Sequence, residues 1–198
     1  MPLTLATATV AQVVKHETAF LHQEVEQLLI PRLNAIQSLE DYTAILQSFY
    51  AYYLPIEKAI QQQVSSSILP DIEKRRTAML IVDDLAFLGI SIDEKCCENL
   101  PEITSTAQAF GALYVLEGST LGGKMIAKML AKNSSVSIPP GALNFFNGYK
   151  EATGKMWTGF IEVLNQQTDA DTIIHAANQT FYYLKNWLQK DLGYESEN

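Results

Sequence analysis

The sequence is poor in cysteine and in basic residues, and each deficit excludes a class of protein. Its 198 residues include only two cysteines, Cys96 and Cys97, which are adjacent and cannot form an ordinary disulfide without strain. A disulfide framework is therefore excluded, which favours a reducing cytoplasm. Lys and Arg number 14 against 22 Asp and Glu. The resulting net charge of −8 argues against general affinity for nucleic acid, which needs a cationic surface.

The sequence also has no apolar run close to the ~20 residues that a membrane-spanning helix needs. Residues 1–15 lack the basic start of a signal peptide. We therefore expect a cytoplasmic protein with neither membrane nor nucleic acid as a partner. The length and the 47% hydrophobic content predict one domain over residues 1–198, with residues 1–8 and 194–198 as flexible tails.

Apolar residues recur three and four positions apart along almost the whole chain, and no sustained alternation of apolar and polar residues occurs. This spacing predicts an all-α, single-domain, multi-helical bundle of six or seven helices, with strands absent or trivial. The expected helical segments are 9–29, 38–56, 70–88, 104–132, 142–166 and 168–188.

Several residues mark where these helices begin, bend or end. Ser38-Leu-Glu-Asp41 and Thr168-Asp-Ala-Asp171 are capping-box patterns that predict helix starts. Pro31 is expected to stop the first helix, and Pro55 to kink the second. Gly89 is a stop signal for the third.

The segment 104–132 is unusual because it is helical by period and yet rich in glycine. Each glycine inside a helix costs about 1 kcal/mol relative to alanine, so Gly118, Gly122 and Gly123 must bring some gain. Gly118 and Gly122 are four residues apart and share a face of the helix. Two explanations stay open from the glycines alone. One is a close crossing with another helix, and the other is a flat ligand lying against the backbone.

One of the three histidines has a suitable partner for binding a ligand. His22 lies four residues before Glu26, so the carboxylate can accept a hydrogen bond from the second ring nitrogen of a ligating imidazole. Lys15 lies two turns before His22 on the same face and is placed to meet an anionic group. A single histidine cannot build a zinc site, and no Glu-x-x-His pair for a di-iron site occurs. One axial histidine is sufficient for haem.

Together these motifs resemble the haem oxygenase family, and most closely its bacterial branch associated with phytochromes. The resemblance spans nearly the whole chain, and the glycine-rich helix combined with the histidine segment is its most specific part. It rests on the segments 17–26, 52–57, 84–89 and above all 112–123, and on the spacings Phe146/Tyr149/Trp157/Phe160 and Ala177/Phe181/Trp187.

The resemblance implies an all-helical fold that holds haem between the first helix and the glycine-rich helix. It implies that His22 is the iron ligand, that Glu26 is its hydrogen-bond partner and that Lys15 meets a haem propionate. Gly118 and Gly122 would then lie over the opposite face of the haem. We also expect two further residues of this helix, Thr120 and Gly123, to belong to the cofactor-binding set.

The implied activity is the cleavage of haem by O2 and reducing equivalents to biliverdin, CO and iron. Many members of the family carry an aspartate in the glycine-rich helix, and this chain has Ser119 at that place. We therefore expect a hydroxyl–water chain, through Ser119 and Thr120, to deliver protons. Lys150 and Lys155 are only loose counterparts of the basic residues that clamp the propionates in some relatives.

The electron donor implied is a ferredoxin, an NADPH-linked reductase or ascorbate, and a phytochrome is a candidate acceptor of biliverdin. Lys124, Lys128 and Lys132 form a basic stripe on one helix face, which is either a solvated surface or a docking site for an acidic donor. Two alternatives remain. The first is a haem- or biliverdin-binding protein without turnover, and the second is a helical, thiaminase-like hydrolase that would need a nucleophilic cysteine in its pocket.

Overall fold

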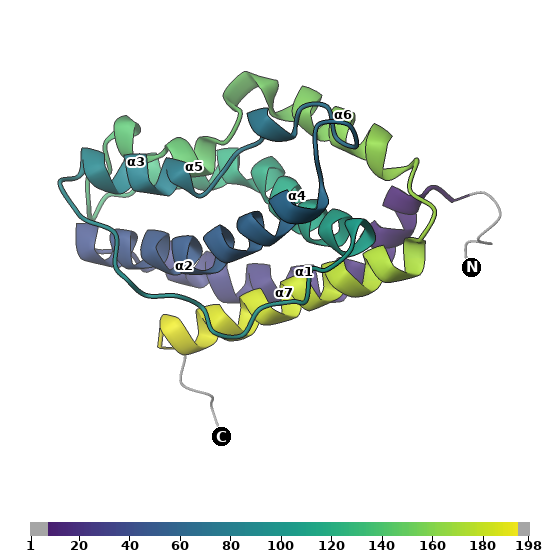
Figure 1. Cartoon of the computed structure of the whole chain (residues 1–198). Helices are drawn as coiled ribbons and strands as arrows, with labels where there is room; N and C mark the ends of the chain where they lie inside the picture. The colour runs from purple at the N-terminus through teal and green to yellow at the C-terminus, as the bar shows by residue number, and fades with distance from the viewer. Residues whose placement is uncertain (1–7, 194–198) are drawn as a thin grey trace.

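The computed structural model describes residues 8–193 as seven α-helices and three short 3-10 helices, with no strand among these residues (Figure 1). The all-α prediction is confirmed. The tails expected at 1–8 and 194–198 fall, except for residue 8, outside the described residues. The helices are α1 (Val10–Asn34), α2 (Leu39–Gln63), η1 (Ile72–Lys74), α3 (Met79–Phe87), α4 (Thr106–Ala131), η2 (Pro140–Ala142), α5 (Asn144–Asn147), η3 (Lys150–Ala152), α6 (Thr153–Leu164) and α7 (Ala170–Asp191).

The first two helices start where side chains cap them. The Thr9 hydroxyl accepts the backbone N–H of Gln12 at the start of α1, and Ser38 caps α2 through the N–H of Asp41, as the capping box predicts. The expected stop at Pro31 is wrong, because α1 continues to Asn34. Pro31 is exposed in the last turn, where losing one helical hydrogen bond leaves a carbonyl that water can satisfy.

The expected third helix, 70–88, is divided in the structure. The 3-10 helix η1 and the helix α3 are separated by residues 75–78. Within this break, Arg75 binds Asp71 and Glu117 through its guanidinium, and the backbone N–H of Arg76 donates to the Tyr149 hydroxyl at 2.6 Å. These tertiary contacts replace the hydrogen bonds of a continuous helix.

The expected helix over 142–166 is also divided, into η2, α5, η3 and α6. Gly148 and Lys150 both have positive φ angles, of 51° and 55°. A right-handed helix cannot pass through such residues, so the chain turns between α5 and α6. The start of α7 also differs from the expected capping box, because Asp169, rather than Thr168, accepts the N–H of Thr172.

The last helix, α7, is the element on which α1 and α4 are both packed (Figure 1). Lys185 of α7 pairs with Glu24 of α1 at 3.1 Å. At Gly111 of α4, an added Cβ would lie 2.4 Å from the carbonyl oxygen of Ile173, so only glycine allows this close approach. The helices α3, α5 and α6 lie on the far side of α4 from α7 (Figure 1).

The core is rich in aromatic residues whose polar ends are satisfied. The buried Tyr42 hydroxyl donates to the carbonyl of Ala142 at 2.5 Å, and the Tyr52 hydroxyl donates to that of Thr180 at 2.6 Å. Phe49, Tyr52 and Tyr53 of α2 are also buried. Among the described residues, no helix is both long and apolar enough to cross a membrane.

Candidate functional site

His22 lies on an accessible face of α1. Thr18 and Val25, one turn before and one turn after it, are buried, so His22 lies at the edge of the buried face of α1, with about half of its side chain exposed. Its Nε2 atom is 3.5 Å from Oε1 of Glu26, and the ring packs on Phe181 of α7 with centroids 5.5 Å apart. Among the described residues, Nδ1 of His22 has no hydrogen-bond partner, so this ring nitrogen is available to a ligand.

Lys15 is exposed on the same helix, two turns before His22. A lysine ammonium at this position presents three hydrogen-bond donors to solvent and is suited to an anionic group. The other exposed histidine of this helix, His16, hydrogen-bonds its neighbour Glu17 at 2.9 Å through Nδ1. His16 therefore differs from His22, whose nearest carboxylate lies one turn away.

The four glycines of α4 fall into two pairs with different surroundings. Gly111 and Gly123 are required by packing, because an added Cβ would lie 2.4 Å from Ile173 O and 2.3 Å from Phe146 O. At Gly122 an added Cβ would meet nothing within 4 Å. At Gly118 it would meet only the Trp157 ring, at the ordinary contact distance of 3.7 Å. The helix-crossing explanation therefore accounts for the first pair and leaves Gly118 and Gly122 unexplained by the fold.

Ser119 stands beside the open glycines at the centre of a hydrogen-bond cluster. Its Oγ donates to the carbonyl of Leu116 at 2.7 Å and accepts from Nη2 of Arg76 at 2.8 Å. The Tyr53 hydroxyl donates to the same Oγ at 3.3 Å. Neither Arg76 nor Tyr53 is among the site residues expected from the sequence. The adjacent arginines Arg75 and Arg76 were the available signal, in a segment that also carries Asp71, Glu73 and Lys74.

Thr120 and Gly123 lie on the buried side of α4. The Thr120 hydroxyl donates to the carbonyl of Glu117 at 2.6 Å, and its side chain faces Gly148. Gly123 packs against the backbone of Phe146. Both residues face the interior instead of the face that carries Gly118 and Gly122. The expectation that they belong to the cofactor-binding set stays a prediction.

A buried cluster of charged and polar side chains holds α4 at Glu117, the residue before Gly118. Nη1 of Arg75 donates to Glu117 at 2.7 Å and to the carbonyl of Met156 at 2.9 Å. The Tyr149 hydroxyl donates to both oxygens of Glu117, at 2.8 and 3.0 Å. Burial raises the pKa of Tyr149 well above its usual range, so the phenol stays protonated and remains a donor. The sequence analysis did not identify this cluster, because its members are far apart in the chain.

A contact between Thr18 and Tyr114 relates the His22 face of α1 to the glycine face of α4. The Tyr114 phenol hydrogen-bonds the Thr18 side chain, and burial raises the pKa of this phenol despite that bond. His22 follows Thr18 by one helical turn, and Gly118 follows Tyr114 by one turn. In Figure 1, α1 and α4 both run away from the end at which α7 begins. His22 and Gly118 therefore lie beyond the contact in the same direction.

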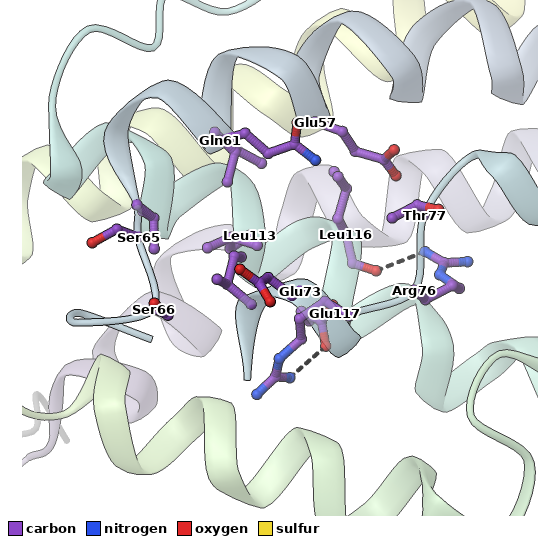
Figure 2. A pocket seen from close by; sticks show the side chains of 14 residues that line it. Glu57, Gln61, Ser65, Ser66, Glu73, Arg76, Thr77, Leu113, Leu116 and Glu117 are labelled. Atoms are coloured by element: carbon purple, nitrogen blue, oxygen red, sulfur yellow. Dashed lines mark hydrogen bonds and ion pairs between the residues drawn. The ribbon is translucent and has the colours of Figure 1, made fainter. Parts of the chain in front are cut away.

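A cavity of about 310 Å³ lies on the other side of α4 (Figure 2). Its walls come from α2, from the break between α2 and α3, and from α4, and include Glu57, Arg76 and Leu116. Burial raises the pKa of Glu57 to about 7, and the backbone N–H of Ala78 and the charge of Arg76 oppose this shift. A second hollow lies beside Lys155 on α6. Neither is lined by His22 or by the open glycines.

Cys96 and Cys97 are free and lie in the segment between α3 and α4. The backbone N–H of Cys97 donates to the carbonyl of Ala51, which holds this segment against α2. Cys97 is buried, and burial raises the pKa of its thiol. A less acidic thiol is a poor nucleophile at neutral pH, which does not favour the hydrolase alternative.

Comparisons with known proteins agree with this arrangement of helices. Residues 8–190 match the sequence profile of a protein family described as "Heme oxygenase". A heme oxygenase of Xanthomonas campestris pv. campestris (strain 8004) is 30% identical over 131 residues, which cover 65% of this chain and 74% of that protein. The NO- and CO-bound heme oxygenase of Neisseria meningitidis has a similar fold, with a TM-score of 0.76 at 22% identity over 97% of this chain and 96% of that one.

Proposed function

Because the chain belongs to the haem oxygenase family, we propose that α1 and α4 hold haem between the His22 face and the open glycines. The chain is an oxidoreductase, and enzymes of its family cleave haem to biliverdin, CO and iron. In this proposal His22 is the iron ligand, Glu26 its partner and Lys15 the counterion of a propionate. Gly118 and Gly122 face the opposite side of the ring.

The pair of open glycines is the observation that carries this proposal. A helix interior loses about 1 kcal/mol for each glycine relative to alanine. Packing explains this cost at Gly111 and Gly123 but not at Gly122, where nothing lies within 4 Å. A flat, wide ligand that approaches the backbone accounts for the missing side chains. The donor set agrees, since a neutral imidazole with a carboxylate partner, such as His22 with Glu26, would suit haem iron.

Bound haem supplies the iron at which O2 is reduced and the ring that is opened. The residues of the chain provide orientation and protons. Glu26 Oε1 lies 3.5 Å from Nε2 of His22 and is the carboxylate that would orient this ring once a ligand is bound, and the Phe181 ring packs on it at a centroid distance of 5.5 Å. Ser119 supplies protons to the glycine face in this proposal, when its hydroxyl turns away from the Leu116 carbonyl to which it donates at 2.7 Å. Gly118 and Gly122 have no side chains, which leaves room on this face of α4 for a small molecule and water.

O2 and an external reductant complete the proposed reaction. The reductant we propose is an acidic ferredoxin that docks on the basic stripe Lys124, Lys128 and Lys132, all of which are exposed. An NADPH-linked reductase or ascorbate would serve the same chemistry. The proposal includes a cytoplasmic location, supported by the two free cysteines. The phytochrome-associated branch and a phytochrome as acceptor of biliverdin stay predictions from the sequence.

A titration of the protein with hemin, followed by absorption, tests the site. We expect the wild-type protein to give a sharp Soret band with one equivalent, and to convert the bound haem to biliverdin when ascorbate is added in air. His22→Ala should lose this Soret band and the turnover, and added imidazole should restore part of both. His16→Ala is the matched control, because His16 is an exposed histidine of the same helix.

Three outcomes would contradict the proposal. Biliverdin formation by His22→Ala at the wild-type rate without imidazole would remove His22 from the site. Equal losses in His16→Ala and His22→Ala would show that the effect is not specific to the proposed ligand. Tight haem binding without turnover in the wild-type protein would favour the carrier alternative.

A further inference from the structure

Two large apolar side chains of α4 are exposed beside the open glycines. Leu121 is 48% exposed and Met125 is 77% exposed. Residues three, four and seven positions apart share one face of a helix, so Gly118, Leu121, Gly122 and Met125 form a continuous apolar strip. Exposed apolar side chains that gather on one face commonly mark a site for a ligand or a partner.

The opposite face of the same helix is closely packed. Thr120, Ala127 and Leu130 are each at most 3% exposed. The exposure of the apolar strip is therefore not a result of loose packing around α4. Glycines let a flat ligand approach the backbone, and apolar side chains beside them can contact its edge, as in ligand sites that are lined mainly by apolar groups.

Lys15 and Met125 lie at opposite ends of the proposed haem site. His22 and Gly118 are each one turn beyond the contact that joins α1 to α4, and the two helices run in the same direction from it (Figure 1). Lys15 precedes His22 by seven residues, and Met125 follows Gly118 by seven. Seven residues correspond to about 10 Å along a helix axis. A propionate that meets Lys15 therefore leaves the other edge of the ring toward Met125.

We propose that Leu121 and Met125 contact the haem ring, and that Met125 determines which edge of the ring lies at its end of the site. The inference rests on the proposed function, because it assigns further residues to the same haem site. Haem has its propionates on one edge and methyl and vinyl groups on the other edges. The sulfur of a methionine packs favourably at the edge of an aromatic ring, and its side chain has no hydrogen-bond donor for a carboxylate.

Lys128 defines the competing arrangement of the ring. It is exposed and lies three residues beyond Met125, so it could attract propionates to that end of the site. Met125 projects between Lys128 and the open glycines, and it would then be covered by carboxylates instead of vinyl groups. Burying a thioether against charged groups gains little, whereas burying it against vinyl groups removes apolar surface from water on both sides. The proposed orientation is therefore the one with the propionates at Lys15.

A comparison of two porphyrins tests the contact at Met125 without any turnover. Titration of the haem-free protein, followed at the Soret band, gives the Kd for hemin and for deuterohemin, in which hydrogen replaces each vinyl group. We expect Met125→Ala to weaken hemin binding by about tenfold, the effect of losing a small apolar contact in a ligand pocket. The same variant should weaken deuterohemin binding by a smaller factor, because the partner of Met125 is missing. Equal factors for the two porphyrins would overturn the assignment of Met125 to the vinyl edge.

Two further variants control for effects on the fold. Met79→Ala is matched to Met125→Ala, because Met79 is a 52% exposed methionine of α3, away from the apolar strip. It should bind both porphyrins as the wild-type protein does. Leu121→Ala should weaken both to the same extent, because Leu121 lies between the open glycines and faces the body of the ring. Urea unfolding of haem-free Met125→Ala should match wild type, and a marked loss of stability would show that the residue acts through the fold.

The lysines decide which way the propionates point. Lys15→Ala should weaken hemin binding, and Lys128→Ala should leave the Kd for hemin unchanged. The reverse result would place the propionates beside Met125 and overturn the proposed orientation.

Hemin affinity separates failure of this inference from failure of the proposed function. If the wild-type protein gives no haem complex, the proposed function is wrong. If wild type binds hemin and both Leu121→Ala and Met125→Ala bind it equally well, only this inference is wrong. Slower ferredoxin-driven turnover of Met125→Ala with unchanged hemin affinity would assign Met125 to the docking of the donor, and would also overturn the inference.

Discussion

Nη1 of Arg75 lies 2.7 Å from Oε2 of Glu117, and each of the two side chains has 3% of its surface exposed. The pair joins the break before α3 to the middle of α4. It holds α4 from one side at the residue before Gly118, while Trp157 contacts that glycine from α6. A buried ion pair and an aromatic ring therefore fix the position of α4 at Gly118.

Removing one partner of this pair is expected to destabilise the protein strongly. Glu117→Ala leaves Arg75 and the Tyr149 hydroxyl buried without their acceptor, which costs about 3–5 kcal/mol in comparable buried pairs. Urea unfolding of the haem-free protein measures the loss. Glu73→Ala, which removes an exposed carboxylate, is the control and should change the unfolding free energy by less than about 0.5 kcal/mol. Equal stability of Glu117→Ala and wild type would show that the ion pair contributes nothing.

The two pairs of glycines in α4 should respond to alanine in opposite ways. Gly111→Ala and Gly123→Ala force a Cβ to within 2.4 Å of a backbone oxygen and should destabilise the haem-free protein by about 1–3 kcal/mol. Gly122→Ala meets nothing and should stabilise it by about 1 kcal/mol through helix propensity. Thermal and urea unfolding test both signs. Destabilisation by Gly122→Ala would mean that this glycine is required by the fold.

A large side chain at Gly118 is expected to obstruct the ligand face. Gly118→Leu should weaken haem binding, or the binding of O2 to the reduced haem complex, by at least about tenfold, because the Trp157 ring lies 3.7 Å from the Cβ position and leaves the longer side chain only the space toward the proposed ring position. Gly154→Leu on α6 is the control, since that glycine is exposed and has no neighbour within 4 Å. Unchanged haem and O2 affinities in Gly118→Leu would place the ligand elsewhere.

The Glu57 carboxyl should make the stability of the haem-free protein depend on pH. Its pKa is raised from 4.5 to about 7 in the fold, so the folded state binds the proton more tightly than the unfolded chain does. The stability that comes from this proton is complete below pH 4.5 and is lost as the pH rises through 7. The loss is on the order of 2–3 kcal/mol for such a shift.

Comparison of wild type with Glu57→Gln isolates this contribution from other titrating groups. The variant keeps an oxygen acceptor for the Ala78 N–H but has no ionisable proton. Its unfolding free energy, measured in urea, should rise relative to wild type between pH 5 and pH 8. A difference that stays constant over this range would contradict the raised pKa.

The basic stripe on α4 should matter only for a protein reductant. Replacing Lys124, Lys128 and Lys132 together by glutamate should slow ferredoxin-driven turnover by at least about tenfold at low salt, because charge steering changes association rates by that much or more. Ascorbate-driven turnover of the same variant should match wild type. Equal slowing with both reductants would show that the stripe acts through the fold and not through docking.

Local sequence signals predicted the parts of the fold that depend on local physics. The period of apolar residues predicted the bundle, and the Ser38 capping box predicted the start of α2. The breaks at 75–78 and 148–152 were missed, because a tertiary network around Glu117 and a positive φ at Lys150 outweigh local helix propensity there. Helix periodicity carries no information about such partners.

The sequence alone determined that the chain is a helical bundle, that it has a histidine suited to ligate one haem iron, and that one of its helices is rich in glycine. Only the tertiary structure decided which glycines have free space beside them, since that depends on what packs where a Cβ would be. The backbone of Phe146 fills this space at Gly123, and nothing lies within 4 Å of it at Gly122. It also decided that Arg76 holds Ser119 and that Thr120 faces the interior. Contacts between residues far apart in the chain exist only once the helices are packed, and for that reason no local pattern contains them.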